Sequence, residues 1–177
     1  YLIHVSLHSL EDPPTPPFVD TVQFRGDSYR EEPPYASLNH VGMAYATYST
    51  TDLDGDFAYL QAKGVEFVSS PVTAPNGERF VFLKDQDGAF LKLIETAEGE
   101  APTPGPNLVR LVNTNMNVAD LERSREFYRL LGFTESAPNS QAGSGEFAAA
   151  HGFDGPIAFE GVDVSLGEGT DGATLQL

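Results

Sequence analysis

Apolar and polar side chains alternate over residues 1–9, with Ile3 on one face and His4 on the other. A period of two residues is typical of a β-strand with one buried face. Residues 11–38 hold six prolines and no sustained period. We therefore expect a long connection there, with at most a short strand near residues 21–25.

Residues 43–49 are rich in aromatic and small side chains and are compatible with a strand, and a helix follows them. Three apolar positions of this helix fall at i, i+4 and i+7, which places them on one face that can lie on a sheet. These positions are Leu53, Phe57 and Leu60. Thr51 or Asp52 supplies the N-cap, and Gly64 supplies the left-handed residue that commonly ends a helix.

Three further strands follow the helix, at residues 65–69, 79–84 and 90–95. Residues 75–77 read Pro-Asn-Gly and residues 85–88 read Asp-Gln-Asp-Gly, and both sequences favour tight turns between strands. The predicted order of this unit is therefore strand, helix and three strands.

The same order repeats later in the chain. The helical segment that begins at residue 51 recurs 68 residues later, at residue 119, and residues 87–93 are answered 84 residues later by residues 171–177. A repeat at this period indicates a fold built from copies of one small unit.

In the second copy we expect a strand at residues 109–118, a helix at residues 121–131 capped by Asp120, and a helix end at Gly132. The inward positions of this helix are expected to be Leu121, Phe127, Tyr128 and Leu131. Residues 137–155 are rich in glycine and alanine, so we expect a mobile loop there.

These patterns predict an α+β fold of tandem βαβββ modules. We expect residues 1–10 to be the last strand of an incomplete first module, residues 11–39 and 99–107 to be linkers, and residues 40–98 and 108–177 to be two modules. Because the first copy is incomplete and the chain stops inside a strand, we expect the second module to be followed by a missing one.

The charge and the residue composition of the chain exclude several classes of binding partner. The 177 residues hold 10 Lys and Arg against 26 Asp and Glu, a net charge of −16 that opposes phosphate backbones and anionic lipid surfaces. The chain has no cysteine, which excludes disulfides and cysteine-ligated zinc within it. No stretch reaches the roughly 18 apolar residues of a spanning helix, and no signal peptide is visible. We expect no nucleic-acid or membrane partner and a cytoplasmic location.

Residues 118–124 and 127–133, which read Val-Ala-Asp-Leu-Glu-Arg-Ser and Phe-Tyr-Arg-Leu-Leu-Gly-Phe, resemble the glyoxalase/bleomycin resistance protein/dioxygenase group, the vicinal oxygen chelate superfamily. Residues 64–67 and 85–88 add a second signature of the same kind. The resemblance implies incurved mixed sheets of the glyoxalase/bleomycin resistance/dihydroxybiphenyl dioxygenase-like type. Two modules would form a cup that holds a small molecule and a divalent cation such as Mn, Fe, Ni, Zn or Mg.

In that superfamily the metal ligands come from the first and last strands of each module. The last-strand position falls on His4, Lys92 and Gln176, and the first-strand position falls on Tyr45 and Asn113. None of the five is a carboxylate, and an ammonium group has no lone pair for a metal. We therefore assign no metal ligand in this chain, and a metal depends on ligands from missing modules.

The sequence leaves the roles of these residues open. Lys92 either anchors an anion or carbonyl on the cup floor or lies on the outer face of its strand, and His4 is either a ligand or base or a hydrogen-bonded strand histidine. We take Lys92 and His4 as candidate catalytic residues. Tyr45, Asn113 and Gln176 are candidate substrate-binding residues, with Asn113 and Gln176 in a second cup completed by the missing module.

His40 precedes its strand position and His151 falls in the expected loop, so we expect turn capping for the first and solvation for the second. The alternative for His40 is a ligand role, if its strand carries an insertion, whereas His151 is not expected to be part of a site.

The resemblance implies a glyoxalase- or dioxygenase-like enzyme with lyase, isomerase or dioxygenase chemistry on an oxygen-rich or aromatic metabolite. The alternative is a non-catalytic small-molecule-binding protein like the bleomycin-resistance branch. Loss of every carboxylate ligand favours the alternative, and the acidic charge would attract a cationic ligand. Exposed strand edges are also compatible with a homodimer.

Overall fold

The structure is a computed structural model that describes residues 3–7, 19–23, 35–99, 102–166 and 173–177. The strands are β1 (Ile3–Leu7), β2 (Val19–Gln23), β3 (Gly42–Thr50), β4 (Glu66–Phe67), β5 (Val72–Thr73), β6 (Arg79–Lys84), β7 (Phe90–Glu95), β8 (Leu108–Asn117), β9 (Thr134–Pro138), β10 (Gln141–Gly143), β11 (Ile157–Phe159), β12 (Val162–Leu166) and β13 (Ala173–Gln176). The helices are α1 (Leu53–Ala62), α2 (Leu121–Leu130) and α3 (Glu146–Ala150).

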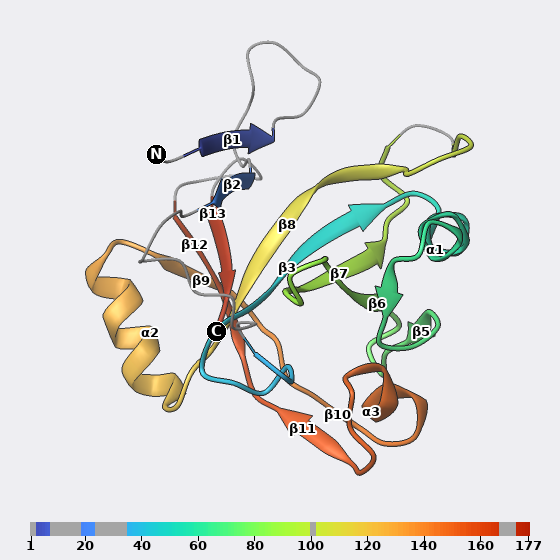
Figure 1. Cartoon of the computed structure of the whole chain (residues 1–177). Helices are drawn as coiled ribbons and strands as arrows, with labels where there is room; N and C mark the ends of the chain where they lie inside the picture. Colours follow the sequence, from blue (N-terminus) through green and yellow to red (C-terminus); the bar gives the residue numbers. More distant parts are fainter. Residues whose placement is uncertain (1–2, 8–18, 24–34, 100–101, 167–172) are drawn as a thin grey trace.

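One mixed sheet runs through the described part of the chain, in the order β4-β6-β7-β3-β8-β13-β12-β9, with β5 paired to β6. In each half the last strand lies parallel to the first, β7 beside β3 and β13 beside β8. The two first strands, β3 and β8, pair antiparallel and join the halves. The expected α+β fold of βαβββ modules is confirmed, and Figure 1 shows the curved sheet with α1 and α2 outside it.

The N-termini of both long helices follow the sequence prediction. Asp52 accepts a hydrogen bond from the backbone N–H of Gly55 at 2.9 Å, and Asp120 accepts one from Arg123 at 3.0 Å. Each carboxylate satisfies an N–H group that the first helical turn leaves free.

The C-termini also follow the prediction. Gly64 and Gly132, which come just after α1 and α2, have φ of 85° and 90°. Only glycine adopts this left-handed conformation without strain, so the chain can turn sharply toward the next strand.

The inward face of α1 was predicted correctly, and that of α2 only in part. Leu53, Phe57 and Leu60 pack in one apolar cluster with side chains of β6 and β7. In α2 the inward Leu121 and Tyr128 pack against β12.

Phe127 and Leu131, which were expected inside, are each 54% exposed. At about 100° per residue Leu131 points about 80° away from Leu121, and Phe127 points away from Tyr128 by a similar angle. The expectation for these two side chains was therefore wrong, because only the Leu121 and Tyr128 side of the helix faces the sheet.

The expected mobile loop at residues 137–155 is a folded insertion. Strands β10 and β11 pair antiparallel, and α3 lies between them in the chain. Phe147 and Ala150 of α3 are buried against Phe80 and Phe82, which belong to the first module, and α3 contacts β5. The loop prediction was wrong because the alanine-rich segment forms a helix that finds its apolar partner in the other module.

The N-terminal strand β1 pairs antiparallel with β2 in a separate two-stranded sheet. Side chains of this sheet lie outside the described part of the structure. The interpretation of residues 1–10 as the last strand of another module therefore stays a prediction. No helix among the described residues is long and apolar enough to cross a membrane.

A buried carboxylate ties the linker between the modules to α1. Asp56 is fully buried and accepts hydrogen bonds from the Thr50 hydroxyl at 2.5 Å and from the backbone and side-chain N–H groups of Asn107 at 2.9 Å each. The backbone oxygen of Asn107 in turn accepts from Thr51 at 3.2 Å. This network sets the point from which β8 starts beside β3.

Replacing Asp56 by alanine removes the acceptor of the buried Thr50 hydroxyl and of the backbone N–H of Asn107. We expect Asp56→Ala to lower the free energy of unfolding in urea by about 2–4 kcal/mol. The matched control is Asp54→Ala in the same helical turn, because Asp54 forms only an exposed ion pair with Arg79 and should cost less than about 1 kcal/mol. Equal losses in the two variants would contradict the role of Asp56.

Candidate functional site

A cavity of about 280 Å³ is lined by strands of both modules and by the insertion. Tyr45, Lys92, Asn113 and Gln176, four of the five residues singled out in the sequence, all line it. Asn113 and Gln176 therefore share a cup with Lys92, and the expectation of a second cup for them was wrong. The reason is the β3–β8 pairing, which brings the first strands of the two modules side by side.

Strand register arranges the lining in two rows on one face of the sheet. Thr47 of β3 lies opposite Lys92 on β7 and Asn113 on β8, and we call these three residues the Lys92 row. The second row, which we call the Tyr45 row, lies two residues away from the Lys92 row along both β3 and β8. It runs over four adjacent strands through Tyr45, Asn115, Gln176 and Asp163. Side chains two residues apart share a face, so both rows point into the same space.

Lys92 faces the cavity as an ion pair with Glu78. Its side chain is 12% exposed, Nζ lies 2.5 Å from Oε1 of Glu78, and the same nitrogen lies 4.9 Å from the centre of the Phe80 ring. The neighbouring Leu93 is buried on the opposite face beneath α1. The ammonium group is thus neutralised by a carboxylate and an aromatic face before any ligand enters.

The Tyr45 row is a chain of hydrogen bonds. The Tyr45 hydroxyl donates to Oε1 of Gln176 at 3.2 Å, and Nδ2 of Asn115 donates to the same oxygen at 3.3 Å. Nε2 of Gln176 donates to Oδ1 of Asp163 at 3.3 Å. The row therefore fixes the orientation of the Gln176 amide.

The pKa values of two acids in the cavity are raised. Burial raises the pKa of the Tyr45 hydroxyl well above its usual range, so this group stays a hydrogen-bond donor. Burial, followed by repulsion from Glu78, also raises the pKa of the Asp163 carboxyl, which the nearby Lys92 partly offsets.

His151, expected in solvent, lies directly after α3 and lines the cavity. Its Nδ1 lies 2.8 Å from the backbone oxygen of Phe147, and its ring is 4.6 Å from the Phe147 ring and 5.2 Å from the Phe80 ring. A carbonyl oxygen can only accept, so Nδ1 carries the proton. Burial lowers the pKa of His151, the Phe147 carbonyl opposes that effect, and Lys92 adds to it.

Two buried amide oxygens of the cavity lining lack donors. Oδ1 of Asn113 and Oε1 of Gln141 are inaccessible to solvent and have no hydrogen-bond partner within the described ranges. A buried acceptor without a partner is unfavourable, so these two oxygens are suited to donors on a bound molecule.

The remaining sequence candidates lie elsewhere or outside the described residues. His40 is exposed and its ring stacks on that of Tyr35 at 5.0 Å. His4 belongs to β1, whose side chains the structure does not describe, so its pairing with Lys92 in catalysis stays a prediction.

Sequence reasoning missed seven polar residues of the cavity lining, and the ones the site depends on most are Glu78, Gln141, His151 and Asp163. One of them left a signal that could have been read. Residues 146–150 read Glu-Phe-Ala-Ala-Ala, and His151 and a glycine follow them. This composition favours a helix and the glycine favours its end, which predicts a short helix and an ordered position for His151.

Two βαβββ modules that pair through their first strands, with polar rows around one cavity, define a two-module cup protein. The sequence profile of the Glyoxalase/Bleomycin resistance protein/Dioxygenase superfamily matches residues 4–93, and the profile of the bleomycin resistance protein-like N-terminal domain matches residues 110–141. The chain belongs to the glyoxalase/bleomycin resistance protein/dioxygenase superfamily.

Solved structures agree on the fold. Glyoxalase I from Zea mays is 21% identical, with a TM-score of 0.52 over 77% of this chain and 42% of that one. Two mutant structures of the same enzyme are also 21% identical with TM-scores of 0.52, and they cover 77% and 80% of this chain and 42% and 44% of theirs. The chain thus spans less than half the length of these proteins. A search of curated protein sequences found no match.

Members of this superfamily typically bind a divalent metal, but the donors in this cavity do not fit one. Lys92 presents N–H donors and a positive charge, and the Tyr45 hydroxyl stays protonated. Oε1 of Gln176 already accepts two hydrogen bonds, which leaves only the neutral oxygen of Asn113 at the four strand positions. The described residues contain no group of three His, Cys, Asp or Glu side chains placed to hold a metal ion.

The lowered pKa of His151 makes folding sensitive to pH. Below about pH 6.5 the unfolded chain takes up a proton at this histidine while the folded chain resists. Stability is therefore lost as pH falls from that value to the lower pKa of the folded state, and the loss then levels off.

His151→Phe keeps a ring in the aromatic cluster and removes this titration. We expect the thermal midpoint of the wild type to fall relative to that of the variant between about pH 7.5 and 5. Scanning calorimetry at several pH values measures the difference, and a difference that does not change with pH would contradict the burial of a neutral His151.

Proposed function

We propose that this chain binds a small molecule with several N–H or O–H donors and a positive charge, in the cavity between its two modules. The observation that carries the proposal is the pair of buried, unpartnered oxygens on Asn113 and Gln141 in one cavity. Buried acceptors are normally satisfied, so a ligand toward which both amide groups turn, and which donates to them, supplies hydrogen bonds that the protein itself does not.

Charge around the cavity supports a cationic ligand. Glu78 and Asp163 face the cavity with Lys92 as the one lysine or arginine among its lining residues. The Lys92–Glu78 ion pair leaves Asp163, whose pKa is raised by burial and by Glu78, as the group that gains most from a nearby cation. The net charge of −16 adds a long-range attraction for cations.

This proposal favours a binding protein over an enzyme in which Lys92 and His4 are catalytic. An ammonium group that already contacts the Glu78 carboxylate at 2.5 Å and the Phe80 ring is a poor anchor for a second anion. Binding without chemistry is the kind of function found in the bleomycin-resistance branch of the superfamily.

A metal-free enzyme is the second candidate, and the Asp163 carboxyl favours it. A carboxyl whose pKa is raised holds a proton more readily than an exposed one and can give it to a substrate, and such groups are concentrated at active sites. In this reading the chemistry is a proton transfer of lyase or isomerase type on a small metabolite. The metal-free enzyme would be favoured if the wild type converts a bound ligand and Asp163→Asn still binds that ligand but no longer converts it.

The first test compares two probes of similar size and opposite charge, n-butylamine and butyrate, against the isotope-labelled chain by NMR. We expect n-butylamine to shift the side-chain amide signals of Asn113 and Gln141, and butyrate to leave them unchanged. Binding should persist in EDTA, because no ligand contact is assigned to a metal.

Matched variants locate the binding. Gln141→Leu removes one buried acceptor and should weaken n-butylamine by about threefold to tenfold, the usual worth of one hydrogen bond. Gln61→Leu removes an exposed amide on α1 and should change nothing. Equal affinity for butyrate, or no binding of either probe, would refute the proposal.

A further inference from the structure

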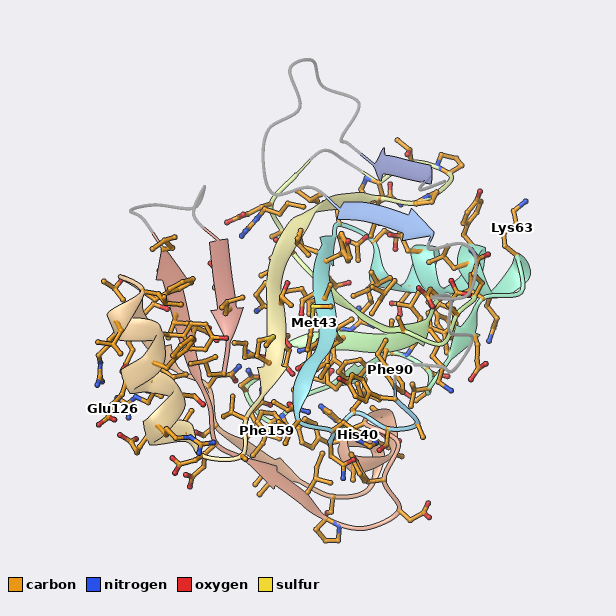
Figure 2. The ribbon with its side chains drawn as sticks, turned by 60° about the vertical axis from the view of Figure 1, so that its left-hand side comes forward. His40, Met43, Lys63, Phe90, Glu126 and Phe159 are labelled. Atoms are coloured by element: carbon orange, nitrogen blue, oxygen red, sulfur yellow. The ribbon has the colours of Figure 1, made fainter. Side chains whose placement is uncertain are left out.

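A second cavity of about 480 Å³ adjoins the first. The two share a wall of five residues: Tyr45, Asn139, His151, Phe159 and Gln176. Three of these five are aromatic. In Figure 2 Phe159 lies on β11 at the end of the sheet where the segment carrying His40 also lies, and the neighbouring Asn39 lines this second cavity.

A ladder of asparagines on β8 contributes to the lining of both cavities. Residues 113–117 read Asn-Thr-Asn-Met-Asn, so Asn113, Asn115 and Asn117 follow one another on one face of the strand. Asn113 lines the first cavity, and Asn115 and Asn117 line the second. Neighbouring members of the ladder are about 7 Å apart along the strand.

The asparagines of the ladder differ in which hydrogen-bonding groups are already used. Asn117 donates to the backbone oxygens of Leu38 and His40, and so holds the segment that borders the second cavity. Asn115 is only 8% exposed, and its Oδ1 has no hydrogen-bond partner in the described part of the chain. The second cavity thus contains one buried, unused acceptor of its own.

Around this acceptor the lining is mixed, and it includes the carboxylate of Glu160 as well as apolar side chains. Leu38, Phe153, Pro156, Ile157 and Phe159 contribute to it, and Leu38 is buried in the main apolar cluster. The apolar part of this lining, with the buried Oδ1 of Asn115 beside it, suits a flat hydrophobic group with one donor at its far end. The first cavity, by contrast, offers two carboxylates and two free amide oxygens.

We infer that the two cavities hold one ligand, an arylalkylamine with a hydroxyl group on its ring. Its ammonium group lies in the first cavity, its ring passes the aromatic wall into the second, and its hydroxyl donates to Oδ1 of Asn115. A phenylethylamine skeleton spans the separation between Asn113 and Asn115. The inference rests on the proposed function and adds the identity of the ligand class to it.

The test is calorimetric titration of the whole chain with ethylamine, 2-phenylethylamine and tyramine. The ring should tighten binding by at least about tenfold over ethylamine, because it is removed from water. The ring hydroxyl should add about threefold to tenfold more through one buried hydrogen bond.

Variants separate the two contributions. Asn115→Leu should remove the advantage of tyramine over 2-phenylethylamine, and Phe153→Ala should reduce the advantage of 2-phenylethylamine over ethylamine. The control is Phe127→Ala, which truncates an exposed phenylalanine of α2 outside both cavities and should change neither ratio. Nuclear Overhauser contacts between the tyramine ring and Phe153 in the wild type test the same placement without a mutation.

The outcomes distinguish this inference from the proposed function. If the alkylamines bind and the ring or its hydroxyl adds nothing, the two-cavity ligand is wrong and the cationic cup stands. If none of the amines binds, both the proposed function and the two-cavity ligand are refuted. Contacts from the tyramine ring to Lys92 instead of Phe153 would also overturn the inference, because the ring would then occupy the first cavity.

Discussion

The antiparallel pairing of β3 with β8 is the constraint on which the site depends. It joins two modules that each place their last strand parallel to their first, so the four strands that carry the polar rows become neighbours. A shift of β8 by one residue in this register would turn Asn113 and Asn115 away from the cavity while Tyr45 and Thr47 stayed beside Lys92. The Asp56 network stabilises this arrangement from outside, because it fixes the linker where β8 begins.

The insertion after β9 converts an open sheet face into two bounded cavities. Its helix α3 is part of the second module in sequence but packs on the first, through Phe147 against Phe80. This crossing contact places His151 and Phe159 between the two cavities. A short helix of five residues is stable here because it buries its apolar side chains in the other module and not because of its own propensity.

The chemistry of the cup departs from a metal centre in a consistent way. Lys92 occupies a last-strand position, and its charge is met by Glu78, a carboxylate from the chain just before β6. The Tyr45 row then connects the opposite strands by neutral hydrogen bonds that end at Asp163. What remains unused around the cavity is mainly acceptor oxygen, and this favours a donor-rich ligand over an anion.

The sequence by itself determined the elements and the repeat, because caps, glycine stops and apolar stripes are local. Asp52, Asp120, Gly64 and Gly132 act where the pattern placed them. Only the tertiary structure decided that Asn113 shares a cavity with Lys92 and that Glu78, Asp163 and His151 join it. Those contacts arise from strand register and from the packing of α3 on the other module. The order of residues can indicate the short helix, but it indicates neither the register nor the partner of that helix.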